Sequence, residues 1–192
     1  MEAPRRGLRL AAPLVLLFGA GIVVLLLDAI EGPRAPDTRF ALLGSEPVGM
    51  NSLLGDPLLV NFWATTCSIC REEMPKLAKL YRELHPRGLE IIGVAMPYDP
   101  PNLVADYVER VSIPYPVSLD VDAEIVDAFG DVTVTPTTFL ISPDGFVVRR
   151  YVGRLDFATL RVQIHALLPP AHIETPGGQP AAGTRIVMRN LP

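Results

Sequence analysis

The sequence predicts a three-layer α/β domain with a mixed central sheet, preceded by one membrane-spanning helix. Short apolar runs rich in β-branched residues alternate with stretches of helical periodicity, which is typical of a sheet covered by helices. Two further runs near the end of the domain flank a tight turn and indicate an antiparallel hairpin. An uncharged apolar stretch close to the N-terminus is long enough to cross a bilayer.

The N-terminal segment is patterned as a membrane anchor. Three arginines in residues 1–9 are followed by eighteen uncharged residues, 10–27, and then by acidic residues. This charge order predicts a cytoplasmic segment over 1–9, a transmembrane anchor over 10–28 and a domain on the outer side, in a bacterium the periplasm. A linker is expected over 29–39. A cleaved signal peptide is the alternative, because small residues such as Ala29 follow the span, and the domain is exported in either case.

Composition and the C-terminal end limit the remaining possibilities. The chain has 192 residues and a net charge of −4, which excludes a strongly basic surface and with it a nucleic-acid partner. One domain with a real core can be built from this length. Residues 169–192 are rich in proline and glycine and lack periodicity, so we expect an irregular tail there.

The first half of the domain is expected to form a strand, a helix and a second strand. The sequence contains two apolar runs that indicate buried strands, at residues 58–64 and 89–96. The helix between them continues to Leu84 and carries apolar residues at i, i+3, i+4 and i+7: Leu77, Leu80, Tyr81 and Leu84. Two strands joined in this way form a parallel pair with a right-handed crossover.

The second half adds a helix, a strand with a short helix, a hairpin and a closing helix. The first helix begins at Asn102, with an expected inward stripe of Leu103, Val104, Tyr107, Val108 and Val111. A strand over 115–119 and a helix over 123–129 follow. Strands over 137–141 and 146–152 flank the turn sequence Ser142-Pro143-Asp144-Gly145. The closing helix spans 157–168, with Leu160, Ile164, Leu167 and Leu168 inward.

The two cysteines of the chain, Cys67 and Cys70, lie at the junction of the first strand and the first helix. A helix N-terminus favours thiolate over thiol, so Cys67 is expected to be the nucleophile. Cys70 lies about one turn further into the helix, where it can close a short disulfide and is less exposed. The spacing therefore predicts an attacking cysteine with a resolving partner.

The cysteine pair has two other interpretations. Half of a zinc site would need further ligands, but the chain has no other cysteine, and His85, His165 and His172 lack ligand spacing. A stabilising disulfide across so short a loop would remove little entropy from the unfolded chain. The redox interpretation is therefore preferred, with no metal and no bound cofactor beyond the Cys67–Cys70 pair itself.

Several of these features resemble a known family. The order of elements, Phe62-Trp63-Ala64 leading into the cysteine pair, the helix proline Pro75 and the string 135–141 resemble the thioredoxin superfamily. More narrowly, they resemble the membrane-anchored TlpA, ResA and DsbE (CcmG) group, whose characteristic strand-helix insertion matches 115–129. The resemblance covers residues 40–168, which we expect to form a thioredoxin-like domain.

The resemblance implies roles for residues around the sulfur atoms. Pro136 would be a cis-proline facing the cysteine pair, although the residues alone allow an ordinary trans proline at a strand start. Thr135 would then help to set substrate preference. Glu73, otherwise a surface glutamate, would handle protons during exchange. Trp63 is expected to form a wall of the site.

The resemblance also implies a function. Cys67 would attack a disulfide of an exported protein, such as an apocytochrome c or copper-site cysteine pair, and a membrane protein would supply electrons. Thr66 stands where the group usually has tryptophan, and Ser68-Ile69 replaces a proline-containing pair, so the direction of electron flow stays open. The alternatives are a dithiol oxidant and a carrier of copper or another soft metal on the same cysteines.

Overall fold

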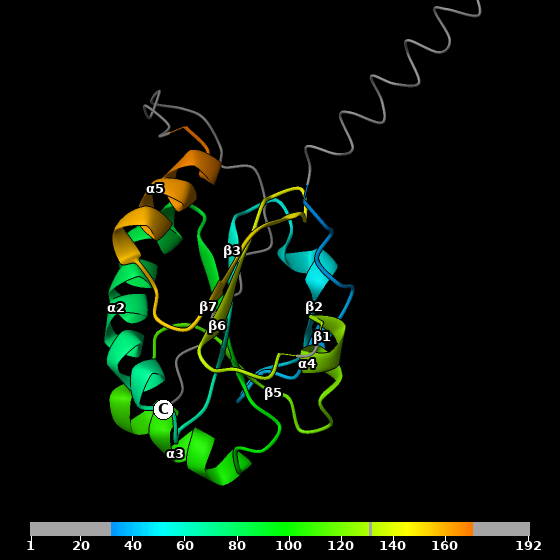
Figure 1. Cartoon of the computed structure of the whole chain (residues 1–192), viewed down its shortest axis with the longest axis vertical. Helices are drawn as coiled ribbons and strands as arrows, with labels where there is room; N and C mark the ends of the chain where they lie inside the picture. Colours follow the sequence, from blue (N-terminus) through cyan, green and yellow to red (C-terminus); the bar gives the residue numbers. More distant parts are fainter. Residues whose placement is uncertain (1–31, 131, 171–192) are drawn as a thin grey trace, which may run out of the picture. The chain divides into compact units, whose positions relative to one another are not determined.

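The structure, a computed structural model, describes residues 32–130 and 132–170, which include a five-stranded mixed sheet flanked by helices (Figure 1). The strand order is β5-β4-β3-β6-β7. The strands are β3 (Leu58–Trp63), β4 (Glu90–Ala95), β5 (Val117–Leu119), β6 (Thr137–Ile141) and β7 (Val147–Val152). The helices are α2 (Ser68–Leu84), α3 (Pro101–Val111), α4 (Glu124–Ala128) and α5 (Phe157–Leu167), with 3-10 helices η1 (Met50–Leu53) and η2 (His85–Arg87). The predicted three-layer, thioredoxin-like α/β fold is confirmed in this part of the chain.

Pairing directions place the ends of several strands at one edge of the sheet. β3 pairs in parallel with β4, and β4 with β5, whereas β6 is antiparallel to both β3 and β7. The ends of β3, β4, β5 and β7 therefore meet the beginning of β6. The segment that carries Cys67 and Cys70 leaves the sheet at this edge.

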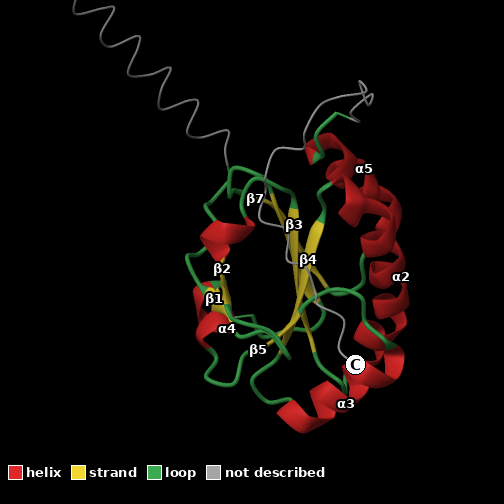
Figure 2. Ribbon diagram, turned by 180° about the vertical axis from the view of Figure 1, so that it is seen from behind, coloured by secondary structure: helices red, strands yellow, loops and turns green. Residues whose placement is uncertain are grey.

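The two faces of the sheet are covered differently. Helices α2, α3 and α5 lie on one face, while α4 and the small two-stranded sheet lie on the other (Figure 2). Successive side chains of β3 point to opposite faces of the sheet, as the pleat of a strand requires. Leu59 and Trp63 pack with α2 and α5, whereas Val60 and Phe62 pack with residues of α4 and η1. Each layer thus has its own apolar core.

Aromatic contacts fill the core on the α4 side. Phe62 meets Phe129 and Phe139 edge to face, with ring centroids 5.3 and 5.9 Å apart. Such pairs add about 0.5–1.5 kcal/mol beyond the area they bury. The predicted strand-helix insertion is confirmed as β5 and α4, and α4 supplies part of this core through Ile125 and Val126.

The predicted inward stripe of α3 is partly wrong. Val104 is buried, but Leu103 and Val111 are 48% and 44% exposed. Tyr107 and Val108 are partly buried and pack against the core, as expected. The helix covers only the margin of the core, so Val111 lines a groove beside α2. The stripe of α5 is closer to expectation, since Leu160, Ile164 and Leu168 are buried and Leu167 is half-buried.

The beginning of the described chain is tied to the domain. Arg34 forms an isolated antiparallel β-bridge with Phe146, and Ala35 N donates to Gly145 O at 2.8 Å. The small sheet then pairs β1 (Arg39–Phe40) with β2 (Val48–Gly49), which the sequence did not predict. Among residues 32–130 and 132–170, no helix is long and apolar enough to cross a membrane. The predicted anchor over 10–28 and most of the predicted tail lie outside the described residues.

Candidate active site

A tight turn connects β3 to α2 and presents the first cysteine. The backbone N–H of Cys67 donates to the carbonyl of Ala64 at 3.1 Å, which closes the turn. Helix α2 begins at the next residue, so Cys67 is its N-cap. Cys67 therefore lies at the positive end of a 17-residue helix, where thiolate is favoured over thiol.

The two sulfur atoms have different surroundings. Cys67 and Cys70 form a disulfide, with Cα atoms 5.3 Å apart. Cys70 is only 3% exposed and belongs to the core between the sheet and α2, whereas Cys67 is half-buried. The N–H of Cys70 donates to the sulfur of Cys67 at 3.1 Å. A negative charge on Cys67 would thus have both an N–H donor and access to solvent.

The predicted cis-proline lies at the same edge of the sheet. The Thr135–Pro136 peptide bond is cis, as expected. Phe62 pairs with Thr137, and the same antiparallel register places Pro136 opposite Trp63. Pro136 is buried, Thr135 is half-buried, and the carbonyl of Pro136 accepts from Gly153 N at 2.8 Å.

Glu73 is a buried side chain, so the interpretation as a surface glutamate is wrong. It is 1% exposed, and its Oε1 accepts a hydrogen bond from the N–H of Leu155 at 2.7 Å. Its Oε2 has no hydrogen-bond partner among the described residues. Burial raises the pKa of the Glu73 carboxyl more than the Leu155 N–H lowers it. A proton-binding carboxyl therefore stands three residues after Cys70.

Trp63 belongs to the same apolar core as Cys70. It is fully buried at the end of β3, and its ring lies 5.6 Å from that of Tyr107 on α3. Its Nε1 has no hydrogen-bond partner among the described residues. The contacts are those of a packing residue.

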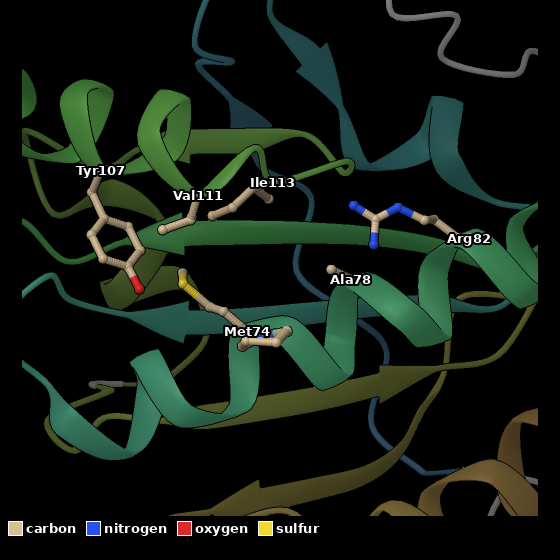
Figure 3. A pocket seen from close by; sticks show the side chains of 7 residues that line it. Met74, Ala78, Arg82, Tyr107, Val111 and Ile113 are labelled. Carbon is tan, nitrogen blue, oxygen red and sulfur yellow. The ribbon is translucent and has the colours of Figure 1, made fainter.

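A groove of about 170 Å³ runs between α2 and α3, as Figure 3 shows. The side chain of Met74 reaches into it toward Tyr107 and Val111, and Arg82 stands near its other end. The lining residues include neither cysteine. The groove is therefore separate from the disulfide.

Asp99 is a site residue that the sequence analysis missed. It follows β4 and is 5% exposed, and its carboxylate accepts bonds from Thr65 in the turn before Cys67. An acidic residue just beyond a buried strand was the available signal, because the carboxyl ends of parallel strands meet at one edge. In the part of the chain that the structure describes, no cluster of three or more His, Cys, Asp or Glu could hold a metal.

Comparisons with known proteins agree with this geometry. The model of the AhpC/TSA family matches residues 32–150. The thiol-disulfide oxidoreductase ResA of Halalkalibacterium halodurans is 35% identical over 143 residues, covering 74% of this chain and 80% of the relative. ResA of Bacillus subtilis is 30% identical over 139 residues, with 72% and 76% covered.

Solved structures show the same likeness. A thiol:disulfide interchange protein of the thioredoxin family from Chlorobium tepidum superposes with a TM-score of 0.65 at 29% identity. The match covers 72% of this chain and 97% of that protein. The cysteine pair at the start of α2 and the cis-proline fall within residues 32–150, which the family model matches. The chain therefore belongs to the AhpC/TSA family, and it is a ResA-like thiol-disulfide oxidoreductase with a thioredoxin fold.

Proposed function

We propose that this protein reduces disulfides of exported proteins on the outer side of a bacterial cytoplasmic membrane. The observation that carries the proposal is the asymmetry of the two sulfur atoms. Cys67 is half-buried at a helix N-terminus, whereas Cys70 is 3% exposed beneath it. A substrate sulfur can approach Cys67, and Cys70 then reacts inside the protein.

The reduction has two steps. The Cys67 thiolate attacks one sulfur of a substrate disulfide, forms a mixed disulfide and releases the other substrate sulfur as thiolate. The Cys70 thiol then loses its proton, and its sulfur attacks that of Cys67. The second substrate thiolate leaves, so two electrons have passed to the substrate and the Cys67–Cys70 pair is left oxidised as a disulfide.

Glu73 is the proposed acceptor of the Cys70 proton. It follows Cys70 by three residues on α2, and side chains so spaced are neighbours on a helix surface. Its raised pKa, caused by burial, brings its proton affinity closer to that of a thiol. Pro136 and Thr135 lie at the sheet edge where an extended substrate segment would bind.

The substrate class and the location follow from the resemblance to ResA-like proteins. We propose that haem-binding cysteine pairs of apocytochromes c or copper-site cysteine pairs are reduced. A membrane protein would re-reduce the Cys67–Cys70 disulfide. The anchor proposed for residues 10–28 would hold the domain at the membrane, in the periplasm of a bacterium.

Trapping tests the proposal directly. Cys70→Ser in cells should leave substrates attached to Cys67 as mixed disulfides that reductant releases, and Cys67→Ser is the matched control that should capture none. Recovery of C70S with Cys67 unmodified would contradict the exchange mechanism.

The direction of electron flow is tested by equilibration with glutathione. A reductase should have a reduction potential near the thioredoxin value of about −270 mV. A value near about −120 mV, as in DsbA, would instead identify a dithiol oxidant. Stoichiometric binding of Cu(I) without disulfide reductase activity would support the soft-metal carrier.

A further inference from the structure

The loop after β4 holds the turn before Cys67 through one carboxylate. Asp99 Oδ2 accepts a hydrogen bond from the backbone N–H of Thr65 at 2.5 Å. Its Oδ1 accepts one from the hydroxyl of the same threonine at 2.6 Å. Asp99 is 5% exposed, so water competes little for these bonds.

Thr65 is part of the turn that presents the attacking sulfur. This turn runs from Ala64 to Cys67 and closes with the 3.1 Å bond from Cys67 N to Ala64 O. Helix α2 begins immediately afterwards, with Arg71 N donating to the carbonyl of Cys67. Fixing Thr65 therefore fixes the backbone from which the side chain of Cys67 projects.

Asp99 is itself rigidly placed. Its N–H donates to the carbonyl of Met96 at 2.9 Å, and Met96 N donates to the carbonyl of Trp63 at 3.0 Å. The loop after β4 is thus joined both to the end of β3, at Trp63, and to the turn itself, at Thr65. Asp99 can hold the turn because its own backbone is held by the sheet.

The Asp99 carboxylate also places a negative charge beside Thr65, which precedes Cys67 by two residues in the sequence. The N-terminus of α2 favours the Cys67 thiolate, and a nearby negative charge opposes it. The first turns of α2 also carry charged side chains: Arg71, Glu72, which pairs with Arg154, and buried Glu73. A dithiol whose thiolate is less stabilised gives up its electrons more readily.

We propose that Asp99 is a positioning residue for Cys67 whose charge also makes the reduced Cys67–Cys70 pair a stronger reductant. The inference rests on the proposed exchange at this pair and adds a determinant of its rate and potential. It accounts for an acidic side chain buried at the sheet edge with both oxygens bound to one residue of the cysteine turn.

The chain offers a matched control for Asp99. Asp120 is 4% exposed and follows β5, one strand further from β3. Its two oxygens accept bonds from the N–H groups of Ile125 and Val126 at 3.0 and 2.8 Å. Asp99→Asn and Asp120→Asn therefore remove the same charge, the first beside the cysteine turn and the second beside α4. D120N also loses a bond from a backbone N–H, whereas the amide in D99N can still donate to the Thr65 hydroxyl.

The test compares full-length wild type, D99N and D120N. For D99N, we expect the equilibrium with glutathione to move about three- to tenfold toward the dithiol, where tenfold corresponds to about 30 mV. The pH dependence of Cys67 alkylation by iodoacetamide should move to lower pH. D120N should lose stability in urea but change neither quantity. A shift in D99N that is absent, reversed or no larger than that of D120N overturns the electrostatic part.

Thr65→Val separates positioning from charge. It removes the hydroxyl bond to Asp99 and keeps the carboxylate. Attack by Cys67 on a peptide disulfide should therefore slow, while the pKa of the Cys67 thiol stays at or above the wild-type value. An unchanged rate overturns the positioning part, and this holds even if D99N does not fold. Failure of wild type to exchange with glutathione would instead contradict the proposed function.

Discussion

Glu73 on α2 accepts a 2.7 Å hydrogen bond from the backbone N–H of Leu155, a residue 82 positions further along the chain. Leu155 lies between β7 and α5, two residues after Gly153, whose N–H binds the carbonyl of Pro136. One short loop is therefore bonded both to the carboxyl near Cys70 and to the cis-proline. Substitutions at Glu73 should therefore change both the stability of the fold and the rate of thiol–disulfide exchange.

Glu73→Gln should change how stability depends on pH. Burial raises the pKa of Glu73 in the folded state, so the folded protein binds this proton more tightly than the unfolded chain. Wild type therefore loses stability as pH rises from the ordinary glutamate pKa through the raised value. Glutamine can keep the bond to Leu155 N but does not titrate, so urea unfolding across this range should show a flatter profile. Parallel profiles for the two proteins would contradict the buried-carboxyl interpretation.

The same substitution should slow the second step of exchange. Without a proton acceptor beside it, Cys70 should resolve the mixed disulfide on the order of tenfold more slowly or worse. Attack by Cys67 should be affected less. Stopped-flow mixing with a peptide disulfide, followed by acid quenching, measures the mixed disulfide directly. Glu72→Gln, at an exposed neighbouring position, is the control, and equal rates in both variants would argue against this role.

Asn61→Ala should destabilise the centre of the sheet. Asn61 Nδ2 donates to Thr138 Oγ1 at 2.8 Å across the β3–β6 pair, and the two residues are 2% and 0% exposed. Removing the amide leaves a buried hydroxyl without this donor, at a cost of about 1–3 kcal/mol. Urea unfolding of N61A, Thr138→Val and the double variant measures the coupling. Strictly additive effects would show that the bond contributes nothing of its own.

Gly93→Ala should disturb the packing of the Trp63 and Tyr115 rings. A Cβ at Gly93 would lie 3.2 Å from Trp63 Nε1 and 3.3 Å from Tyr115 Cε2, and both rings are buried. Overpacking of this kind costs about 1–3 kcal/mol. Trp63 is the one tryptophan of the chain, so its fluorescence reports the displacement.

Gly49→Ala is the matched control for Gly93. No atom lies within 4 Å of a Cβ built at Gly49, and this glycine has a φ of −85°. The control should leave both stability and Trp63 emission close to wild type. If G93A is as stable as G49A and its Trp63 emission is unchanged, the rings of Trp63 and Tyr115 can move enough to accommodate the added methyl group.

Elements with strong periodicity could be predicted from the sequence, and short ones could not. Strands β3 and β4 are buried along their whole length, and apart from Asn61 and Glu90 they are apolar or glycine, because helices or loops cover both faces. Helix α2 shows a regular apolar stripe. Strands β1 and β2 contain two residues each, too few for an alternating pattern. The exposure of Leu103 and Val111 depends on how far α3 overlaps its neighbours, which its own periodicity does not encode.

The residues of the site also differ in whether the sequence could predict them. Cys67, Cys70 and Pro136 could be found because their spacing and their resemblance to a known pattern are local properties of the sequence. The burial of Glu73 could not, because it lies in a charged stretch and is covered by Leu155 from the other end of the domain. Asp99 was missed for the same reason: its partner Thr65 is 34 residues away.

The place where the chain enters the domain has a practical consequence for protein engineering. Arg34 and Ala35 contact Phe146 and Gly145 in the turn between β6 and β7, at the edge where β3 begins. Cys67 follows the opposite end of β3, whose six residues span about 20 Å. An immobilisation tag or a fused reporter attached just before Arg34 would therefore join the domain far from the disulfide, leaving the reactive edge open to a folded macromolecular substrate.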